Sequence, residues 1–180
     1  VFDTVYNAIK NATGVKYFAE DAGLTKANLD KVITAVRRWG KPSIVGDYAL
    51  VSQINAFAGY QGTTPAVNGI SEKVMNEIQS TGLLGMYNGA VVAEMPNPYD
   101  VSKLNEAGDN FATLLDPSVG FVLPAGVQSP IHTITRGGLT SCHGLDVTTG
   151  MEMTRFDLEV GALVTPGQEF KVGVIADTNL

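Results

Sequence analysis

The residues most able to do chemistry lie close together at Ser141, Cys142, His143 and Asp146. A serine or cysteine nucleophile needs a base within hydrogen-bond reach, and a third group must orient that base. In an extended chain, adjacent side chains point to opposite faces, so Cys142 and His143 would not meet locally. A glycine-rich turn that holds a small thiol accounts for the same residues. A cysteine or serine hydrolase using Cys142 or Ser141 with His143 therefore stays as an alternative function.

Metal and nucleotide sites have weaker support. His132 and His143 with Cys142 provide too few ligands for structural zinc, which takes four in paired short spacings. Gly137-Gly138 lacks the strand-to-helix context and glycine spacing of a dinucleotide fold, and no phosphate-binding loop with Lys and Ser/Thr occurs. The sequence therefore predicts no catalytic, cofactor-binding or metal residue, and no cofactor.

Two further patterns have simple structural interpretations. Asp157 and Glu159 lie two residues apart on an expected polar strand face, where solvated charges are far commoner than catalytic carboxylate pairs. Asn11-Ala12-Thr13 matches a glycosylation acceptor, but it is expected at a helix end and no signal-peptide pattern follows Val1. Because Val1 is not an initiator residue, we expect the chain to begin inside a longer one.

Size and composition limit the function classes. A chain of 180 residues suits one domain or one with two lobes. Its net charge of −6 argues against a nucleic-acid-binding surface, since phosphate contacts need a basic stripe. No apolar run approaches the ~20 residues that a membrane-spanning helix needs. The single cysteine excludes an internal disulfide.

The elements that would position these residues begin with the stretch Met151–Ala176. Apolar residues alternate on either side of Thr165-Pro166-Gly167-Gln168, which predicts a long β-hairpin with one buried face. Opposed residues of an antiparallel pair share a face, so their numbers must have the same parity. The expected pairs are Val164 with Phe170, Ala162 with Val172, and Val160 with Val174.

Periodicity along the rest of the chain predicts helices early and strands late, which indicates an α+β fold. Thr25 and Asp47 are the expected N-caps of the second and third helices. The predicted helices are 1–11, 25–39, 47–57 and 71–82. The predicted strands are 43–46, 90–95, 120–123 and 131–135. The predicted irregular segments are the connector 16–24, the loop 59–69, residues 99–118 (with at most a short helix) and the turn-rich 137–144.

Three stretches, in this order, resemble the major capsid proteins of tailed bacteriophages, whose Hong Kong 97-type fold is shared with encapsulin cages. Residues 29–54 are similar to the family's helix, short strand and helix of the axial domain, and residues 82–92 to its glycine-marked entry into a strand. Arg155 to Ile175 resembles the closing pair of strands that returns the chain to the peripheral domain. Nothing matches the family's N-terminal arm and extended loop, so the resemblance implies a carboxy-terminal portion.

The resemblance implies a domain division and a function. Residues 1–15 would end an upstream helix, 16–150 would form an axial-domain-like α/β lobe, and 151–180 a closing β-hairpin. The chain would be a non-enzymatic coat protein of the virion, phage- or prophage-borne, assembled in the host cytoplasm. Copies of it would form pentamers and hexamers of an icosahedral head, with loops 59–69 and 99–118 as candidate contacts.

The implied partners are other copies of the chain, scaffolding, protease, portal or decoration proteins, and double-stranded DNA enclosed without sequence-specific binding. No membrane is implied. An encapsulin-like cargo cage is the alternative from the same fold. A monomeric adhesin or receptor-binding lobe is the alternative from another class.

Overall fold

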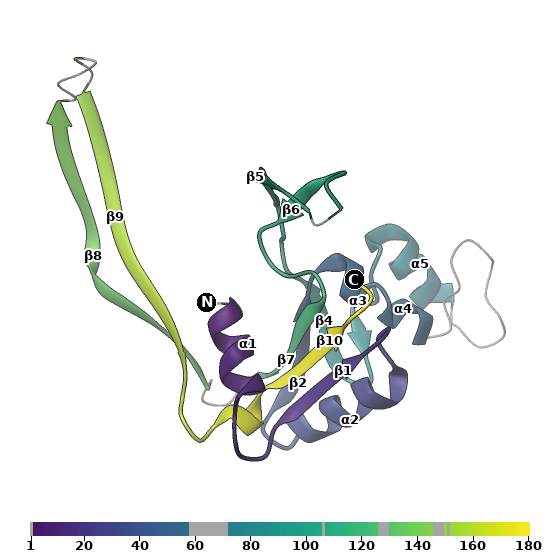
Figure 1. Cartoon of the computed structure of the whole chain (residues 1–180). Helices are drawn as coiled ribbons and strands as arrows, with labels where there is room; N and C mark the ends of the chain where they lie inside the picture. Colours follow the sequence, from purple (N-terminus) through teal and green to yellow (C-terminus); the bar gives the residue numbers. More distant parts are fainter. Residues whose placement is uncertain (1, 58–71, 106, 126–129, 146–149, 151) are drawn as a thin grey trace.

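The computed structural model describes residues 2–57, 72–105, 107–125, 130–145, 150 and 152–180. A mixed six-stranded sheet forms the centre, and two separate two-stranded hairpins leave it (Figure 1). The α+β prediction agrees with this mixed, sheet-dominated architecture. The sheet strands are β1 (Tyr17–Asp21), β2 (Lys41–Gly46), β3 (Met86–Tyr87), β4 (Ala90–Glu94), β7 (Val119–Ala125) and β10 (Gly173–Asp177).

The order of strands in this sheet is β1-β10-β7-β2-β4-β3. β1 runs parallel to β10 and β2 parallel to β4, whereas β7 is antiparallel to both β10 and β2. All five residues of β10 are buried, so this strand is covered on both faces. Its alternate side chains separate two cores, because Ile175 belongs to one cluster while Val174 and Ala176 belong to the other.

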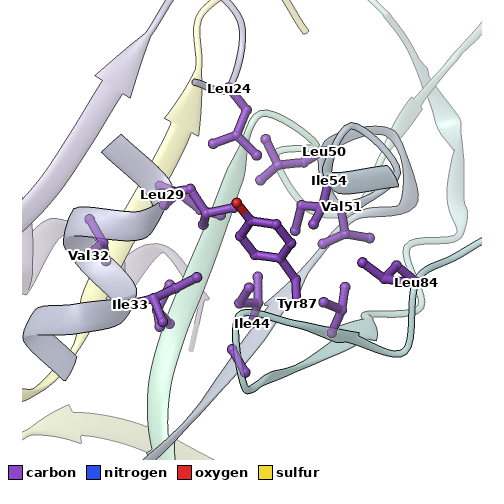
Figure 2. Packing of buried hydrophobic residues seen from close by; sticks show 14 of the residues in the cluster. Leu24, Leu29, Val32, Ile33, Ile44, Leu50, Val51, Ile54, Leu84 and Tyr87 are labelled. Atoms are coloured by element: carbon purple, nitrogen blue, oxygen red, sulfur yellow. The ribbon is translucent and has the colours of Figure 1, made fainter. Parts of the chain in front are cut away.

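Helices cover the two faces unequally. One face packs against α2 (Lys26–Val36), α3 (Tyr48–Val51), α4 (Ile54–Phe57) and α5 (Glu72–Thr81). Figure 2 shows the Tyr87 ring surrounded by residues of this cluster, with Leu29 and Ile33 on one side and Leu50 and Ile54 on the other. The second face packs against α1 (Phe2–Lys10) through Val5 and Ile9.

A buried carboxylate ties the end of the sheet to two connections. Asp177, at the end of β10, accepts hydrogen bonds from the Gly23 amide at 2.7 Å, the Gln53 side chain at 2.7 Å and the Asn179 amide at 2.9 Å. The donation from Gln53 is the largest influence, and it holds the pKa of Asp177 below its ordinary value although burial opposes it. The ionised carboxylate therefore stabilises this junction.

The predicted hairpin over Met151–Ala176 is wrong. β9 (Glu152–Val164) pairs with β8 (Ile131–Leu145), and β10 pairs with β1 and β7. Phe170 lies in a short 3₁₀ helix, η1 (Glu169–Lys171), so it cannot oppose Val164. The two alternating runs have different environments, since Val174 is fully buried while Val160 is about half exposed. Parity fixes which residues share a face but does not identify the partner strand.

Three segments expected to be irregular contain strands. The predicted connector 16–24 contains β1, which pairs with β10. Residues 99–118 contain β5 (Tyr99–Leu104) and β6 (Phe111–Thr113), which pair antiparallel around an irregular register. The glycines of 137–144 lie inside β8: Gly137 and Gly138 form a bulge between Arg136 and Thr140, and Gly144 pairs regularly with Met153. Gly137 has φ +75°, a backbone conformation that would be strained for a residue with a β-carbon. Glycine is therefore needed here to form the bulge, and not the predicted turn.

Most of the predicted helices are confirmed, with changes at their ends. Thr25 is the N-cap residue of α2, but its hydroxyl donates to Asp21 at 3.1 Å and makes no capping bond. Asp47 caps α3 as expected, accepting from the Ala49 amide at 2.8 Å. The single helix expected over 47–57 is two short helices, α3 and α4. The predicted loop 59–69 lies outside the described residues.

Candidate functional site

The residues predicted to be reactive lie on the β8–β9 ribbon, defined as strands β8 and β9. Cys142 opposes Arg155, while His143 opposes Thr154 and Ser141 opposes Phe156. Opposed residues share a face and neighbours alternate, so Cys142 lies on the face opposite His143. This agrees with the argument from the sequence. Cys142 is a free, exposed thiol, and Asp146 lies outside the described residues.

His143 makes its contacts across the ribbon and not along it. Its Nδ1 lies 2.7 Å from the Thr154 hydroxyl, and its Nε2 lies 3.9 Å from a carboxylate oxygen of Glu152. Ser141 shares the face of His143 but lies two residues away, a separation of roughly 6–7 Å along a strand. All of these side chains are exposed, and an open strand face supplies no shielding for a general base.

The possible metal ligands are separated by the length of the ribbon. His132 opposes Leu163 near the root, roughly 30 Å along β8 from Cys142. Within the described part of the chain, no group of three or more His, Cys, Asp or Glu side chains could hold a metal ion.

The two acids on β9 form solvated ion pairs. Asp157 accepts from the Arg155 Nε at 2.7 Å, and Glu159 lies 3.8 Å from the Arg136 Nε. The four side chains are between 45% and 89% exposed, so each pair contributes less than about 1 kcal/mol to stability. Asp157 and Glu159 are therefore solvent-exposed charges on the surface of the ribbon, as the sequence predicted.

The register gives the ribbon two chemically different faces. One, here called the apolar ribbon face, presents Phe156, Leu158, Val160 and Ala162 from β9. The β8 residues that oppose Ala162, Val160 and Phe156 are Thr133, Thr135 and Ser141, which carry hydroxyl groups. The bulge across from Leu158 contains the exposed Leu139. The other face presents Ile134 and Leu163 near the root, and then the ion-paired charges. The ribbon is therefore amphipathic.

The apolar ribbon face is covered only at its root. Val164 is buried and Ile131 partly buried, and both pack in the cluster that contains Val5 and Ile9 of α1. Farther out, where the ribbon leaves the sheet (Figure 1), Phe156 is 62% exposed and Val160 is 51% exposed. A two-stranded hairpin alone is marginally stable in water, so this face is suited to contact with another surface.

The β5–β6 hairpin forms a second exposed apolar surface. A depression of about 740 Å³ lies between its strands, the following segment and the C-terminal Leu180. Its apolar lining is Tyr99, Leu104, Phe111, Leu114, Leu115 and Leu180. The hairpin is attached through Asn97, whose side chain donates to Asp47 at 2.8 Å and accepts from the Leu115 amide at 2.9 Å. Among the described helices, none has the length and apolar character to cross a membrane.

Comparison with known proteins identifies the family. A family model described as SPbeta prophage-derived putative capsid protein YonB matches residues 1–176. The chain belongs to this family. No curated protein and no solved structure gives a match. The phage-capsid part of the resemblance is therefore confirmed, and membership implies a structural role in the virion.

For a capsid-family protein, the exposed apolar surfaces are more informative than the predicted reactive residues. The alternating pattern predicted a buried hairpin face for Phe156, Leu158 and Val160, whereas these side chains are exposed. The signal for their real partner was the β-branched run Ile131-His132-Thr133-Ile134-Thr135, which was predicted as a strand but ended too early. For the β5–β6 hairpin, the weak period of residues 99–115 gave no comparable signal.

Proposed function

We propose that this capsid-family chain is a major shell subunit with the Hong Kong 97-type organisation, which assembles with copies of itself into pentamers and hexamers. The observation that carries the proposal is the uncovered apolar ribbon face. The shell encloses double-stranded DNA without sequence-specific contacts, and assembly occurs in the host cytoplasm. Scaffolding, protease, portal or decoration proteins are the further partners that this role brings.

The energetics suit repeated weak contacts. Phe156, Leu158 and Val160 are each at least half exposed, so complete burial gains about 1 kcal/mol for each side chain. Roughly 3 kcal/mol for one copy is too little for a stable isolated dimer, given the entropy lost on association. In a closed ring every subunit makes several such contacts at once, and the effective concentration of neighbours makes weak contacts sufficient.

The same geometry supports a proposed domain division. We assign the six-stranded sheet with α2–α5 to the axial-domain-like lobe, which takes five strands from residues 16–150 and its sixth, β10, from Gly173–Asp177. We assign α1 and the β8–β9 ribbon, which pack together through Val5 and Val164, to the peripheral part. This changes the expected closing element from a hairpin over 151–180 to a ribbon that also includes β8.

Electron microscopy and light scattering of the complete gene product test this function. We expect ring-shaped capsomers or closed shells whose abundance rises with protein concentration. A product that stays monomeric at every concentration, with or without a scaffolding protein, would contradict the proposal and favour an adhesin-like lobe. Shells formed in host cells that hold protein cargo and no DNA would contradict the genome-enclosing role and indicate an encapsulin-like cage.

A further inference from the structure

The two ends of the central sheet differ in charge and in exposed apolar groups. At one end, β2 begins at Lys41 and β10 begins just after Lys171. Arg37 and Arg38 follow the last residue of α2 at this end. At the other end, β2 finishes at Gly46 and β7 begins at Val119, next to the β5–β6 hairpin (Figure 1). The cationic and anionic groups described below therefore lie at opposite ends of the strands.

The first end, here called the basic edge, combines four cations with an exposed tryptophan. It consists of Arg37, Arg38, Trp39, Lys41 and Lys171. Trp39 is 36% exposed and lies 5.0 Å from Phe170 between ring centroids, while the Lys171 ammonium lies 5.7 Å from the centre of the Trp39 ring. These contacts hold the indole in place at the surface.

The cations of the basic edge form no direct ion pair within the described chain. Arg37 donates to the backbone carbonyl of Asn88, and Lys171 donates to the Gln168 side chain at 3.0 Å. Among the described residues, none of these four cations has a carboxylate oxygen within 4 Å. The ion pairs of the described chain involve Lys103, Arg136, His143 and Arg155 instead. An uncompensated cationic edge attracts an anionic surface.

The opposite end has complementary chemistry. The β5–β6 depression is lined by apolar side chains, with Leu104 62% exposed and Leu114 59% exposed. Asp109 and Asp116 are exposed beside it, and Asp100 is half-buried with Lys103 at 3.7 Å as its partner. An apolar centre with a polar rim is the usual anatomy of a protein interface, and here the rim carries acidic residues. A matching partner carries an aromatic or aliphatic anchor among basic residues.

We propose that the basic edge of one copy docks on the β5–β6 depression of the next copy, with Trp39 against the apolar lining. This inference rests on the proposed function, because it assigns the lateral contact within a capsomer. The two surfaces differ and lie at opposite ends of one molecule, so the contact is heterologous. Heterologous contacts generate rings when the rotation between neighbours closes. Charge complementarity selects a second copy as the occupant of the depression.

A charge-exchange experiment on the complete gene product tests this contact. Arg38→Glu and Asp109→Lys each place like charges across the interface, and we expect each to raise the protein concentration needed for capsomers at least tenfold. Arg38→Glu combined with Asp109→Lys restores opposite charges with their positions exchanged, so it should assemble within about threefold of the wild type. Raising the salt concentration should weaken assembly of the wild type and of the double variant alike.

The control is Lys73→Glu, which makes the same change of charge on an exposed residue of α5, outside both surfaces. It should assemble as the wild type does, and thermal unfolding should show that every variant is folded. If the wild type forms capsomers and the single variants assemble equally well, this contact is wrong while the proposed function stands. If the wild type itself never assembles, both are wrong. If Arg38→Glu lowers only the DNA content of particles, the basic edge faces DNA and not a second copy.

Discussion

The apolar ribbon face can be tested with two substitutions on the same ribbon. Leu158 and Ile134 are exposed to nearly the same extent, 52% and 53%, but they lie on opposite faces. Leu158→Gln places an amide on the apolar ribbon face, and Ile134→Gln places one on the charged face. Both substitutions replace an aliphatic side chain of four carbons by the same uncharged amide at a similarly exposed position, so the monomer should respond similarly to each.

The expected difference follows from the exposure of Leu158. About half of its side chain is still in water in the monomer, so its burial by a neighbour gains about 1 kcal/mol. The Leu158→Gln variant loses this gain in association free energy. Its amide would also be buried at the contact without hydrogen-bond partners, which costs about 1–3 kcal/mol more. A loss of roughly 2–4 kcal/mol per contact raises the dissociation constant of that contact about thirtyfold or more. Ile134→Gln should leave it nearly unchanged.

Sedimentation velocity over a range of protein concentrations measures the assembly threshold, and chemical denaturation of the dilute monomer measures the fold. We expect Leu158→Gln to raise the threshold at least tenfold, with the free energy of monomer unfolding within about 1 kcal/mol of that of Ile134→Gln. Equal thresholds for the two variants would refute the assignment of the apolar ribbon face to subunit contacts. A higher threshold only for Ile134→Gln would mean that the charged face makes the contact.

Three further outcomes concern the fold and the free thiol. Asp177→Asn should lower the free energy of unfolding by about 1–3 kcal/mol. Because folding lowers the pKa of Asp177, the carboxylate stabilises the fold above its unfolded-state pKa of about 4, and this stabilisation is lost as the pH falls through the lower folded-state pKa. Measuring the free energy of unfolding at several acidic pH values detects this loss. Gly173→Ala should cost about 1–3 kcal/mol in thermal unfolding, because the new β-carbon overlaps Val32, whereas Gly144→Ala meets no neighbouring atom and should cost less than 1 kcal/mol. Cys142 should react with a maleimide in the native protein at one equivalent without unfolding it, and an ester- or peptide-hydrolysing activity lost on labelling would revive the hydrolase alternative.

Local patterns predicted the helical part of the lobe well. Leu29, Ile33 and Val36 recur at helical spacing and are fully buried in α2, because one helix has only one way to place them on a core. The N-cap role of Asp47 and the position of β2 were also predicted from residues close together in the sequence. These elements depend on residues within a few positions of one another, which is why the sequence alone sufficed.

Strand pairing was predictable only in part, because it depends on residues far apart in sequence. Val174 lies in a strand as expected, but this strand pairs with β7 and β1, about 50 and 155 residues away in the sequence. A proline and glycine after Val164 suggested a tight turn, whereas the chain there forms an irregular connection and η1. The hydrophobic alternation within one strand shows which face is apolar, but it does not predict which other strand pairs with it.

The exposure of β9 has a different cause from the pairing error. Alternation of Phe156, Leu158 and Val160 correctly indicated one face that avoids water, since such a pattern records what the residues contact in the functional state of the protein. In an isolated chain, this face has no cover beyond the root at Val164. Under the proposed function, a neighbouring subunit supplies the missing cover, and the contrast between a pattern that predicts burial and a structure that shows exposure supports that proposal. The same reasoning applies to the β5–β6 hairpin, where Leu104 and Leu114 are exposed although they show no regular period.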